Sequence, residues 1–310
     1  HKKLKMINAQ AMGGNPVEVI PILGSALDYD MMVNVYKVWL PDTVYHTAAY
    51  KHVPLAETNL IATVKNNVFG TQNMAFLASK FAVSDFVLVS TDKAVRPTNV
   101  MGASKRIAEM YLQGLQNDAS NVTRFSMVRF GNVLASSGSV IPTFLEQIER
   151  GGPVTVTHPE VIRYFMTIHE AAELVIQAGA LARGGEVFLL DMGEPVNILA
   201  LARRLIAACG YTHFISPQTD GDIEIQITGL RPGEKMFEEL LIAGSPNQTV
   251  HPKIFKAQEE FLPSDILTDK LLKLHEACHE CDEERCIALL EQLVIGFKRS
   301  ARGDEIDLSF

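Results

Sequence analysis

The sequence predicts an α/β fold in which a doubly wound, mainly parallel sheet is combined with a smaller mixed domain. Apolar strand-like runs alternate with helix-like periodic segments through the first half of the chain, as in parallel sheets joined by right-handed crossovers. The run Phe86-Val87-Leu88-Val89 is typical of a strand buried on both faces. The polar motif Ser90-Thr91-Asp92-Lys93-Ala94 follows at the carboxyl end of this strand, the edge at which open α/β sheets bind ligands.

Turn signals and periodicity divide the first half into elements. A Gly-Gly-Asn-Pro turn at residues 13–16 precedes a β-branched run, and helical periodicity follows the polar motif. In chain order, we expect a strand at 17–24, a helix at 28–40, a strand at 42–49, a loop at 50–59, a long helix at 60–81, a strand at 86–90, a helix at 101–116 and a strand at 124–133.

The second half is less regular and is expected to form a lid over the sheet. Its predicted elements are short strands at 154–157, 186–191 and 223–228, and helices at 168–183, 197–209 and 234–243. Residues 262–297 are typical of two amphipathic helices with many charges, which we expect to form a solvated outer layer.

Composition limits the class of protein. With 310 residues and 47% hydrophobic content, the chain can bury the core of one large or two unequal domains. A formal net charge of -8 without a basic stripe argues against a nucleic-acid partner, because duplex binding needs clustered Lys and Arg. The apolar runs are shorter than the roughly 20 residues that span a bilayer, and no signal-peptide core follows the N-terminus. These features predict a soluble, cytoplasmic chain.

The cysteines are too few and too clustered for a disulfide framework, which favours reduced thiols. Cys278, Cys281 and Cys286 lie near His275 and His279, a combination that raises the alternative of a metal site. A second ligand pair at finger spacing is missing, and the segment has a helical pattern, so we expect no metal.

A Gly-rich turn is missing from the expected place. Dinucleotide-binding folds begin with a strand, a G-x-x-G-x-x-G turn and a helix whose N-terminus receives the pyrophosphate. Gly13-Gly14 has neither this spacing nor a preceding strand. We therefore interpret the chain as a fragment of a longer protein, without the first β-α-β unit and with weak dinucleotide binding of its own.

Several motifs in the right order carry a family resemblance over nearly the whole chain. They are His46-Thr47-Ala48-Ala49-Tyr50-Lys51-His52-Val53-Pro54, Asn67-Val68-Phe69-Gly70-Thr71, Ser90-Thr91-Asp92-Lys93-Ala94, Met101-Gly102-Ala103-Ser104-Lys105, Arg129-Phe130-Gly131-Asn132-Val133 and Leu230-Arg231-Pro232-Gly233-Glu234-Lys235. Together they resemble the nucleotide-sugar 4,6-dehydratases of the extended short-chain dehydrogenase/reductase superfamily. Within it they resemble the polysaccharide-biosynthesis branch acting on UDP-N-acetylglucosamine.

The resemblance implies a domain division and a reaction. Residues 1–133 would form an incomplete NAD-binding Rossmann domain, and residues 134–310 would mostly bind substrate, with some segments returning to the first domain. Bound NAD would take a hydride from sugar C4, a base would remove the C5 proton, and an acid would protonate the departing C6 hydroxyl. Hydride return to C6 would then give a 4-keto-6-deoxy sugar.

By similarity, Asp92 would be the acid at C6 and Lys93 the base at C5. Reference pKa values of about 3.9 and about 10.4 give each side chain the wrong charge state at neutral pH. The site would have to keep Asp92 protonated by desolvation, and Lys93 neutral by burial near Lys105 or the cofactor's positive ring. The alternative is an exposed ion pair at the strand end.

Met101 stands where most of the superfamily has a catalytic Tyr, four residues before Lys105 on one helix face. Methionine cannot take a proton, although long-form members of the resembled branch also carry Met. We infer that Thr91, Asp92 or Lys93 covers the missing transfer, with Thr91 bonded to the C4 oxygen. The alternatives are that Met101 is a core residue of an inactive enzyme and that Lys105 is a solvated surface lysine.

The remaining candidate residues bind ligands by resemblance. The cofactor set is Ala48, Ala49, Tyr50, Asn67 and Lys105, and the substrate set is Lys51, Asn132, Arg163, Arg231 and Glu234. Asn132 and Arg231 are assigned to the diphosphate, since a guanidinium matches phosphate oxygens. Asn67 could instead bond nearby backbone, and Arg163 could form a surface pair with Glu160 or Glu170.

The sequence leaves three functions open. The first is a dehydratase with tightly held NAD and a UDP-sugar substrate, the second is an NAD-dependent nucleotide-sugar epimerase, and the third is a non-catalytic binding or assembly module. The resemblance also implies a homo-oligomer and a parent protein with a membrane anchor. The configuration at C5 is not determined by the sequence.

Overall fold

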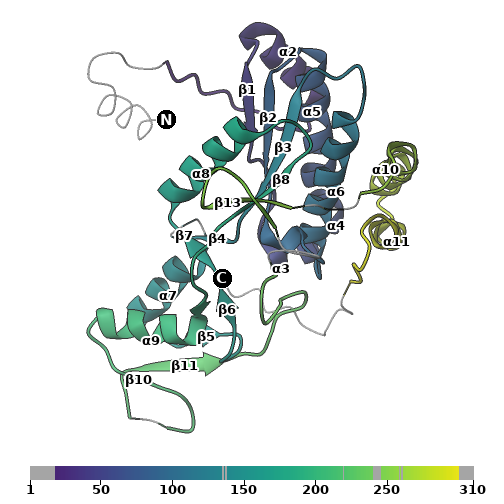
Figure 1. Ribbon diagram of the computed structural model, residues 1–310. Coiled ribbons are helices and arrows are strands. Elements are labelled where there is room, and N and C mark those ends of the chain that lie inside the picture. The colour runs from purple at the N-terminus through teal and green to yellow at the C-terminus, as the bar shows by residue number, and fades with distance from the viewer. Residues whose placement is uncertain are drawn as a thin grey trace.

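The computed structural model of the chain describes residues 18–134, 136, 138–218, 220–239, 246–257, 259 and 261–299. A sheet flanked by helices forms the upper part of the molecule in Figure 1, and a smaller group of strands and helices lies below it. Within the ranges that the structure describes, no helix combines the length and hydrophobicity needed to cross a membrane.

The central sheet is mainly parallel, as predicted. Its strand order is β1-β2-β3-β8-β13-β12. These strands are β1 (Thr43–His46), β2 (Asp85–Val89), β3 (Arg124–Arg129), β8 (Val187–Leu190), β13 (Ile254–Ala257) and β12 (Asn247–Gln248). The first four are parallel to one another, whereas β13 runs antiparallel to β8 and β12 antiparallel to β13. Strands from the second half of the sequence therefore complete this sheet.

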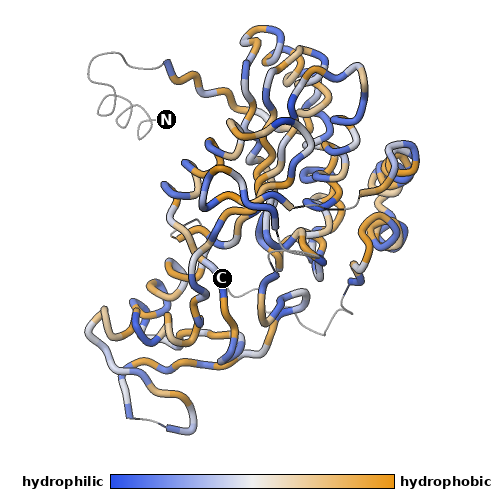
Figure 2. Tube along the Cα trace, in the orientation of Figure 1, coloured by the Kyte–Doolittle hydropathy of each residue, from blue (hydrophilic) through white to orange (hydrophobic). Residues whose placement is uncertain are grey.

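Helices cover both faces of the sheet. One face carries α2 (Tyr29–Trp39), α5 (Gly70–Lys80) and α6 (Val100–Gln116), and the other carries α8 (Ile168–Leu181). Along β2, Phe86 and Leu88 pack in the core with α2, α5 and α6, while Val87 packs with α8. Alternate residues of a strand point to opposite faces, so a run that is apolar at every position fits a doubly wound sheet. Figure 2 shows this concentration of apolar residues along the central strands.

The smaller group has its own core around a three-stranded sheet of order β10-β11-β5. Its elements are α7 (Val140–Glu149), β5 (Val154–Val156), α9 (Ile198–Ala208), β10 (His213–Phe214) and β11 (Ile223–Ile227). Two short ladders lie between the two parts: β4 (Asn132–Val133) with β7 (Phe165–Met166), and β6 (Ile162–Arg163) with β9 (Val196–Asn197).

The two C-terminal helices, α10 (Ser264–His279) and α11 (Glu283–Leu293), form as predicted, but they are not simply a solvated layer. Leu271, Leu274 and Leu290 pack in one apolar cluster with residues of α6 and of α4 (Leu60–Val64). Cys278 and Cys286 lie in this cluster with their Sγ atoms 3.6 Å apart. In the described part of the chain, no group of three or more His, Cys, Asp or Glu is placed to hold a metal ion.

Two predicted elements of the first half are wrong. Residues 18–24 form no strand, Leu23 is 97% exposed, and Pro21 lacks the N–H that a sheet ladder requires; Val17 lies outside the described residues. The expected loop at 50–59 contains a short helix, α3 (Val53–Thr58), because Pro54 fits the first turn of a helix.

The long helix and two later elements also depart in detail. The expected helix at 60–81 runs through α4 and α5 but has one π-helical turn, η1 (Lys65–Phe69), between them. The strand predicted at 124–133 ends at Arg129 and resumes as β4. The helix predicted at 234–243 is wrong over residues 234–239, which form turns and irregular chain; residues 240–243 lie outside the described part.

Candidate active site

A cavity of about 490 Å³ lies at the carboxyl ends of β1, β2 and β3, against the smaller group of elements. Most residues predicted for the site line it: Ala49, Lys51, Thr91, Lys93, Met101, Lys105, Asn132, Arg163, Arg231 and Glu234. Of the other predicted residues, all of which the structure describes, Ala48, Tyr50, Asn67 and Asp92 are not part of this lining. Residues far apart in the sequence therefore meet at one edge of the sheet.

The turn after β2 presents Thr91, Asp92 and Lys93 together. It is a short 3-10 helix, η2 (Asp92–Ala94), and the Thr91 hydroxyl oxygen accepts the backbone N–H of Lys93 at 3.3 Å. Lys93 Nζ lies 3.0 Å from Asp92 Oδ1, and the Thr91 hydroxyl donates to the same oxygen at 2.9 Å. Asp92 is only 2% exposed, so the alternative of an exposed ion pair is wrong.

The carboxylate of Asp92 lies next to the cavity but is not part of its lining. Oδ2 is buried and has no hydrogen-bond partner among the described residues. A Cβ at Gly131 would come within 2.9 Å of this atom, so glycine at 131 leaves the space that Oδ2 occupies. The carboxylate thus has one oxygen engaged and one available.

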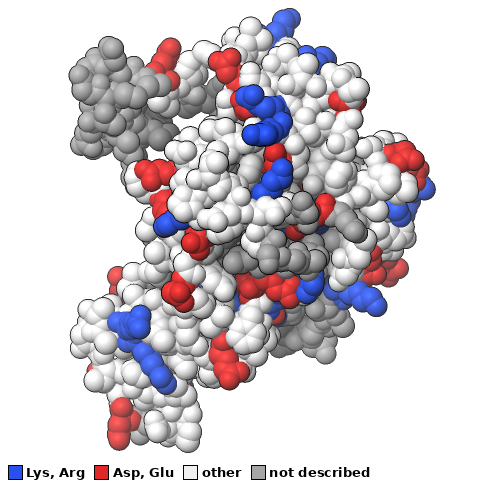
Figure 3. Space-filling model, in the orientation of Figure 1, with Lys and Arg blue, Asp and Glu red and all other residues white. Residues whose placement is uncertain are grey.

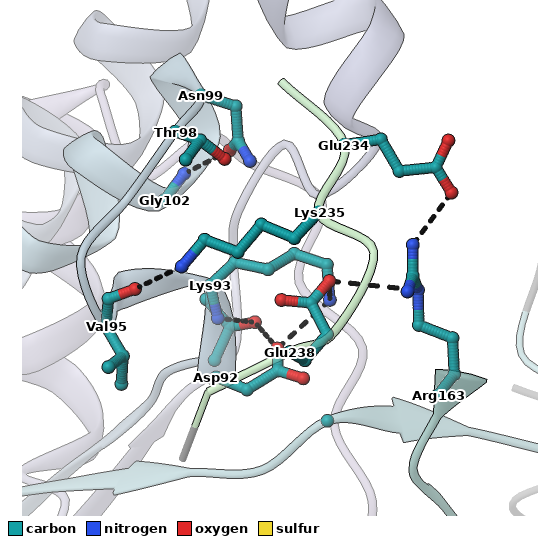
Figure 4. A network of polar contacts seen from close by, with 12 residues as sticks. Asp92, Lys93, Val95, Thr98, Asn99, Gly102, Arg163, Glu234, Lys235 and Glu238 are labelled. Atoms are coloured by element: carbon teal, nitrogen blue, oxygen red, sulfur yellow. Dashed lines mark hydrogen bonds and ion pairs between the residues drawn. The ribbon is translucent and has the colours of Figure 1, made fainter. Parts of the chain in front are cut away.

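A second carboxylate, which the sequence did not predict, flanks Lys93 on another side. Glu238 Oε1 lies 3.6 Å from Lys93 Nζ and 3.8 Å from Arg163 Nε, and its side chain is 4% exposed (Figure 4). Burial acts to lower the pKa of Lys93, but the charges of Asp92 and Glu238 outweigh it and leave this pKa raised. The ligand-free site therefore holds Lys93 as an ammonium, not as the neutral amine that a base at C5 requires.

Arg163 belongs to the site and not to the surface. Its side chain is 10% exposed, and Nη2 lies 2.7 Å from Glu234 Oε1. The alternative of a surface pair is wrong, because the described contacts of Arg163 do not include Glu160 or Glu170, and Glu170 pairs with Lys253. Arg163 and Glu234 thus hold each other at the cavity wall.

Met101 and Lys105 lie on α6 and face the same cavity. Lys105 is 3% exposed, and its Nζ has no hydrogen-bond partner in the described structure, so the alternative of a solvated lysine is wrong. Burial lowers the pKa of Lys105 to about 8, with the charge of Glu109 acting in the opposite direction. A buried ammonium without an acceptor is a place where a polar ligand group fits.

Asn67 acts on backbone, as one of its two interpretations expected. Its Oδ1 accepts the N–H of Tyr50 at 2.7 Å, and its Nδ2 donates to the Tyr50 carbonyl at 3.1 Å and to Ser104 Oγ at 3.0 Å. Asn67 therefore holds Tyr50, in the loop after β1, against α6. The next residue, Lys51, lines the cavity.

Comparison with known proteins identifies the family. The family model described as "Polysaccharide biosynthesis protein" matches residues 2–259. The chain belongs to this family.

Curated members and relatives share much of the sequence. The chain is 50% identical over 274 residues to the capsular polysaccharide biosynthesis protein CapD of Staphylococcus aureus, covering 84% of this chain and 44% of CapD. It is 54% identical over 228 residues to the probable polysaccharide biosynthesis protein EpsC of Bacillus subtilis, covering 73% of this chain and 37% of EpsC. The chain thus spans less than half the length of these two relatives.

Solved structures share the fold. Pen from Bacillus thuringiensis matches with a TM-score of 0.65 and 34% identity, over 76% of this chain and 69% of Pen. TunA, described as an NAD-dependent NDP-hexosamine 5,6-dehydratase of tunicamycin biosynthesis, matches with a TM-score of 0.57 and 20% identity, over 71% and 73% of the two chains. These likenesses agree with the doubly wound sheet of this family member.

The surface of this family member carries mixed charge. On the face shown in Figure 3, Lys and Arg side chains are interspersed with Asp and Glu, and no continuous basic surface extends across it.

Proposed function

We propose that this chain is the catalytic part of an NAD-dependent 4,6-dehydratase that acts on a UDP-N-acetylhexosamine, with UDP-N-acetylglucosamine as the expected substrate. The observation that carries the proposal is the pair of Asp92 and Lys93, 3.0 Å apart at the end of β2 and next to a cavity that Lys105 also lines. Two adjacent groups that can give and take protons are what an elimination needs. The product would serve the synthesis of a surface polysaccharide.

The residues present fit NAD. The Nζ of Lys105, which has no hydrogen-bond partner among the described residues, would donate to the nicotinamide ribose. The loop of Ala48, Ala49 and Tyr50, held by Asn67, would lie along the cofactor. When bound, NAD supplies the hydride acceptor at C4 and the hydride donor at C6. The descriptions of several structural neighbours name NAD, which supports the same choice.

Thr91 and Lys105 offer a route for the C4 hydroxyl proton that does not need a tyrosine. The Thr91 hydroxyl lines the cavity and donates to Asp92 Oδ1 at 2.9 Å. Thr91 Oγ1 would hold the C4 oxygen, and the C4 hydroxyl proton would pass to the neutral form of the Lys105 amine in the same cavity, because Asp92 takes the proton that Lys93 gives up. Met101, which cannot carry a proton, would then only pack against the ligands.

Lys93 and Asp92 would share the elimination. Lys93, on the cavity wall, would remove the C5 proton, and Asp92 would protonate the departing C6 hydroxyl. Both states arise together if the ammonium of Lys93 gives one proton to Asp92: an N–H bond breaks, an O–H bond forms, and the total charge is unchanged. The existing contact at 3.0 Å is short enough for this exchange.

The diphosphate would bind basic and amide side chains of the cavity lining. Arg231 and Lys51 supply positive charge there, and Asn132 supplies an amide just beyond the end of β3. Arg163 is already paired with Glu234, so we assign that pair to shaping the substrate wall and to contacts with uncharged hydroxyl or acetamido groups.

An epimerase is the second candidate, because the chain is 36% identical over 201 residues to a UDP-glucose 4-epimerase of Rickettsia canadensis. The full-length protein is incubated with UDP-N-acetylglucosamine, and the product is analysed by mass spectrometry. Loss of one water supports the dehydratase, whereas an unchanged mass with a new stereocentre supports the epimerase. No turnover by protein shown to hold NAD would favour a binding module.

A further inference from the structure

The segment that carries Glu238 is fastened to the start of α6. The Gly233 carbonyl accepts hydrogen bonds from Thr98 Oγ1 at 2.8 Å and from Asn99 Nδ2 at 3.1 Å. Lys235 Nζ donates to the Val95 carbonyl at 3.1 Å. These contacts hold Gly233 and Lys235, which precede Glu238 on the same segment, beside the active-site turn (Figure 4).

Five charged groups then alternate in sign through the site: Asp92, Lys93, Glu238, Arg163 and Glu234. The positive charge of Lys235, on the same segment, also acts to lower the pKa of Glu238. With every group ionised, these five groups carry one excess negative charge, which the nearby charge of Lys235 offsets. Burial raises the pKa of Glu238, with the charge of Asp92 acting in the same direction and the charges of Lys93, Arg163 and Lys235 opposing it.

The charge of Glu238 bears directly on the proton exchange between Lys93 and Asp92. While Glu238 is ionised, Lys93 has two carboxylates within 4 Å, and giving up its proton would leave a buried carboxylate beside a neutral amine. With Glu238 protonated, Lys93 has one ionic partner, and passing the proton to Asp92 removes both charges at once.

We propose that Glu238 is a positioning residue that sets the protonation state of Lys93, holding it as an ammonium when ionised and releasing the Asp92–Lys93 pair for proton exchange when neutral. This inference rests on the proposed function for its meaning, but the titration of Lys93 that it predicts does not depend on turnover. Glu238 acts through Lys93 and needs no contact with substrate.

The test measures the apparent pKa of Lys93 in the folded chain by competitive acetylation with acetic anhydride across a pH series, read by peptide mass spectrometry. In the wild type, Lys93 should titrate above an ordinary lysine. In Glu238→Gln, which keeps the shape but not the charge, its apparent pKa should fall by about 1 to 3 units, the usual effect of one opposite charge at this distance. The pH profile of dehydration should shift in the same direction.

Two further variants separate charge from packing. Glu239→Gln is the matched control, because Glu239 is the next residue, is 41% exposed and pairs with Arg96 and Lys235 instead of Lys93. It should leave the titration of Lys93 unchanged. Glu238→Asp retains the charge and should keep the pKa of Lys93 raised.

The proposal is overturned if Lys93 titrates at the same pH in wild type and Glu238→Gln, or if Glu238→Asp lowers its pKa as much as Glu238→Gln does. A wild-type Lys93 that titrates below an ordinary lysine overturns it even if Glu238→Gln does not fold. Absence of dehydratase turnover in the wild type would instead reject the proposed function and leave the labelling result to decide the role of Glu238.

Discussion

A Cβ atom at Gly102 would lie 2.1 Å from the carbonyl oxygen of Lys93. Helix α6 can therefore touch the active-site turn only because residue 102 is glycine. This contact brings Met101 and Lys105 to the same cavity as Lys93.

Gly102→Ala should displace the turn or the helix and lower turnover by about 100-fold, the effect of a shift of roughly 1 Å at a reacting group. Gly114→Ala in the same helix is the matched control, since its Cβ would meet the flexible Ser264 Oγ at 3.3 Å. Steady-state kinetics with UDP-N-acetylglucosamine measure both. Equal rates for Gly102→Ala and Gly114→Ala would contradict the required close approach.

Lys93→Ala and Asp92→Asn should each reduce the rate of water loss by about 100-fold or more, as expected for a general base and a general acid. The substitutions remove the groups assigned to C5 and C6, while binding of the diphosphate should be retained. Lys253→Ala, at an exposed pair with Glu170, serves as the control. Near-wild-type rates in either site variant would reject its assigned role.

Lys105→Met should stabilise the ligand-free chain at pH 7. Burial lowers the pKa of Lys105 to about 8 in the folded chain, whereas an unfolded lysine titrates near about 10.4. Between these values the unfolded state binds more protons, so the free energy of unfolding rises with pH through this window. Below pH 8 the buried charge is present in full, and replacing it should add up to about 3 kcal/mol.

Urea denaturation at pH 7 and pH 10 checks this sign. The difference in free energy of unfolding between Lys105→Met and wild type should be smaller at pH 10 than at pH 7. For the exposed Lys80→Met on α5, the difference from wild type should be the same at both pH values. A gap that widens with pH would mean that the Lys105 amine has an acceptor in the folded chain.

Glu57→Gln should destabilise the fold by about 1 to 3 kcal/mol, because it weakens a buried, charge-assisted contact. Glu57 Oε1 accepts the N–H of Val100 at the start of α6, at 2.6 Å, and Oε2 pairs with Arg299 at 3.1 Å. Denaturant midpoints measure the loss. Arg299→Ala should lose less, since the Val100 contact remains, and an equal loss would show that the ion pair dominates.

Local patterns predicted much of the fold. The apolar run at β2 and the periodicity of α6 and α8 depend on neighbouring residues, and these elements formed within a few positions of the prediction. The run at residues 18–24 has the same composition as a strand, but a strand also needs a ladder partner, which composition does not report. The π-helical turn at η1 left no signal that spacing rules detect.

The sequence predicted those residues of the candidate site that stand in recognisable motifs. Thr91, Lys93 and Lys105 were identified because they stand in short motifs, and the structure brings them to one cavity. Glu238 was missed, since its neighbours in sequence predicted a helix and its partners Lys93 and Arg163 come from distant segments. Only the motif ending at Lys235, just before it, marked this part of the chain.

The distance along the sequence between Lys93 and Glu238 has a consequence for biosynthesis. On the ribosome, the turn after β2 emerges long before the segment that supplies its second carboxylate and before β13, which completes its sheet beside β8. Since domains begin to fold during synthesis, a nascent chain can form the first strands while its reactive lysine still lacks one of its two counter-ions. The ion pair between Lys93 and Glu238 can form only after residue 238 has been translated.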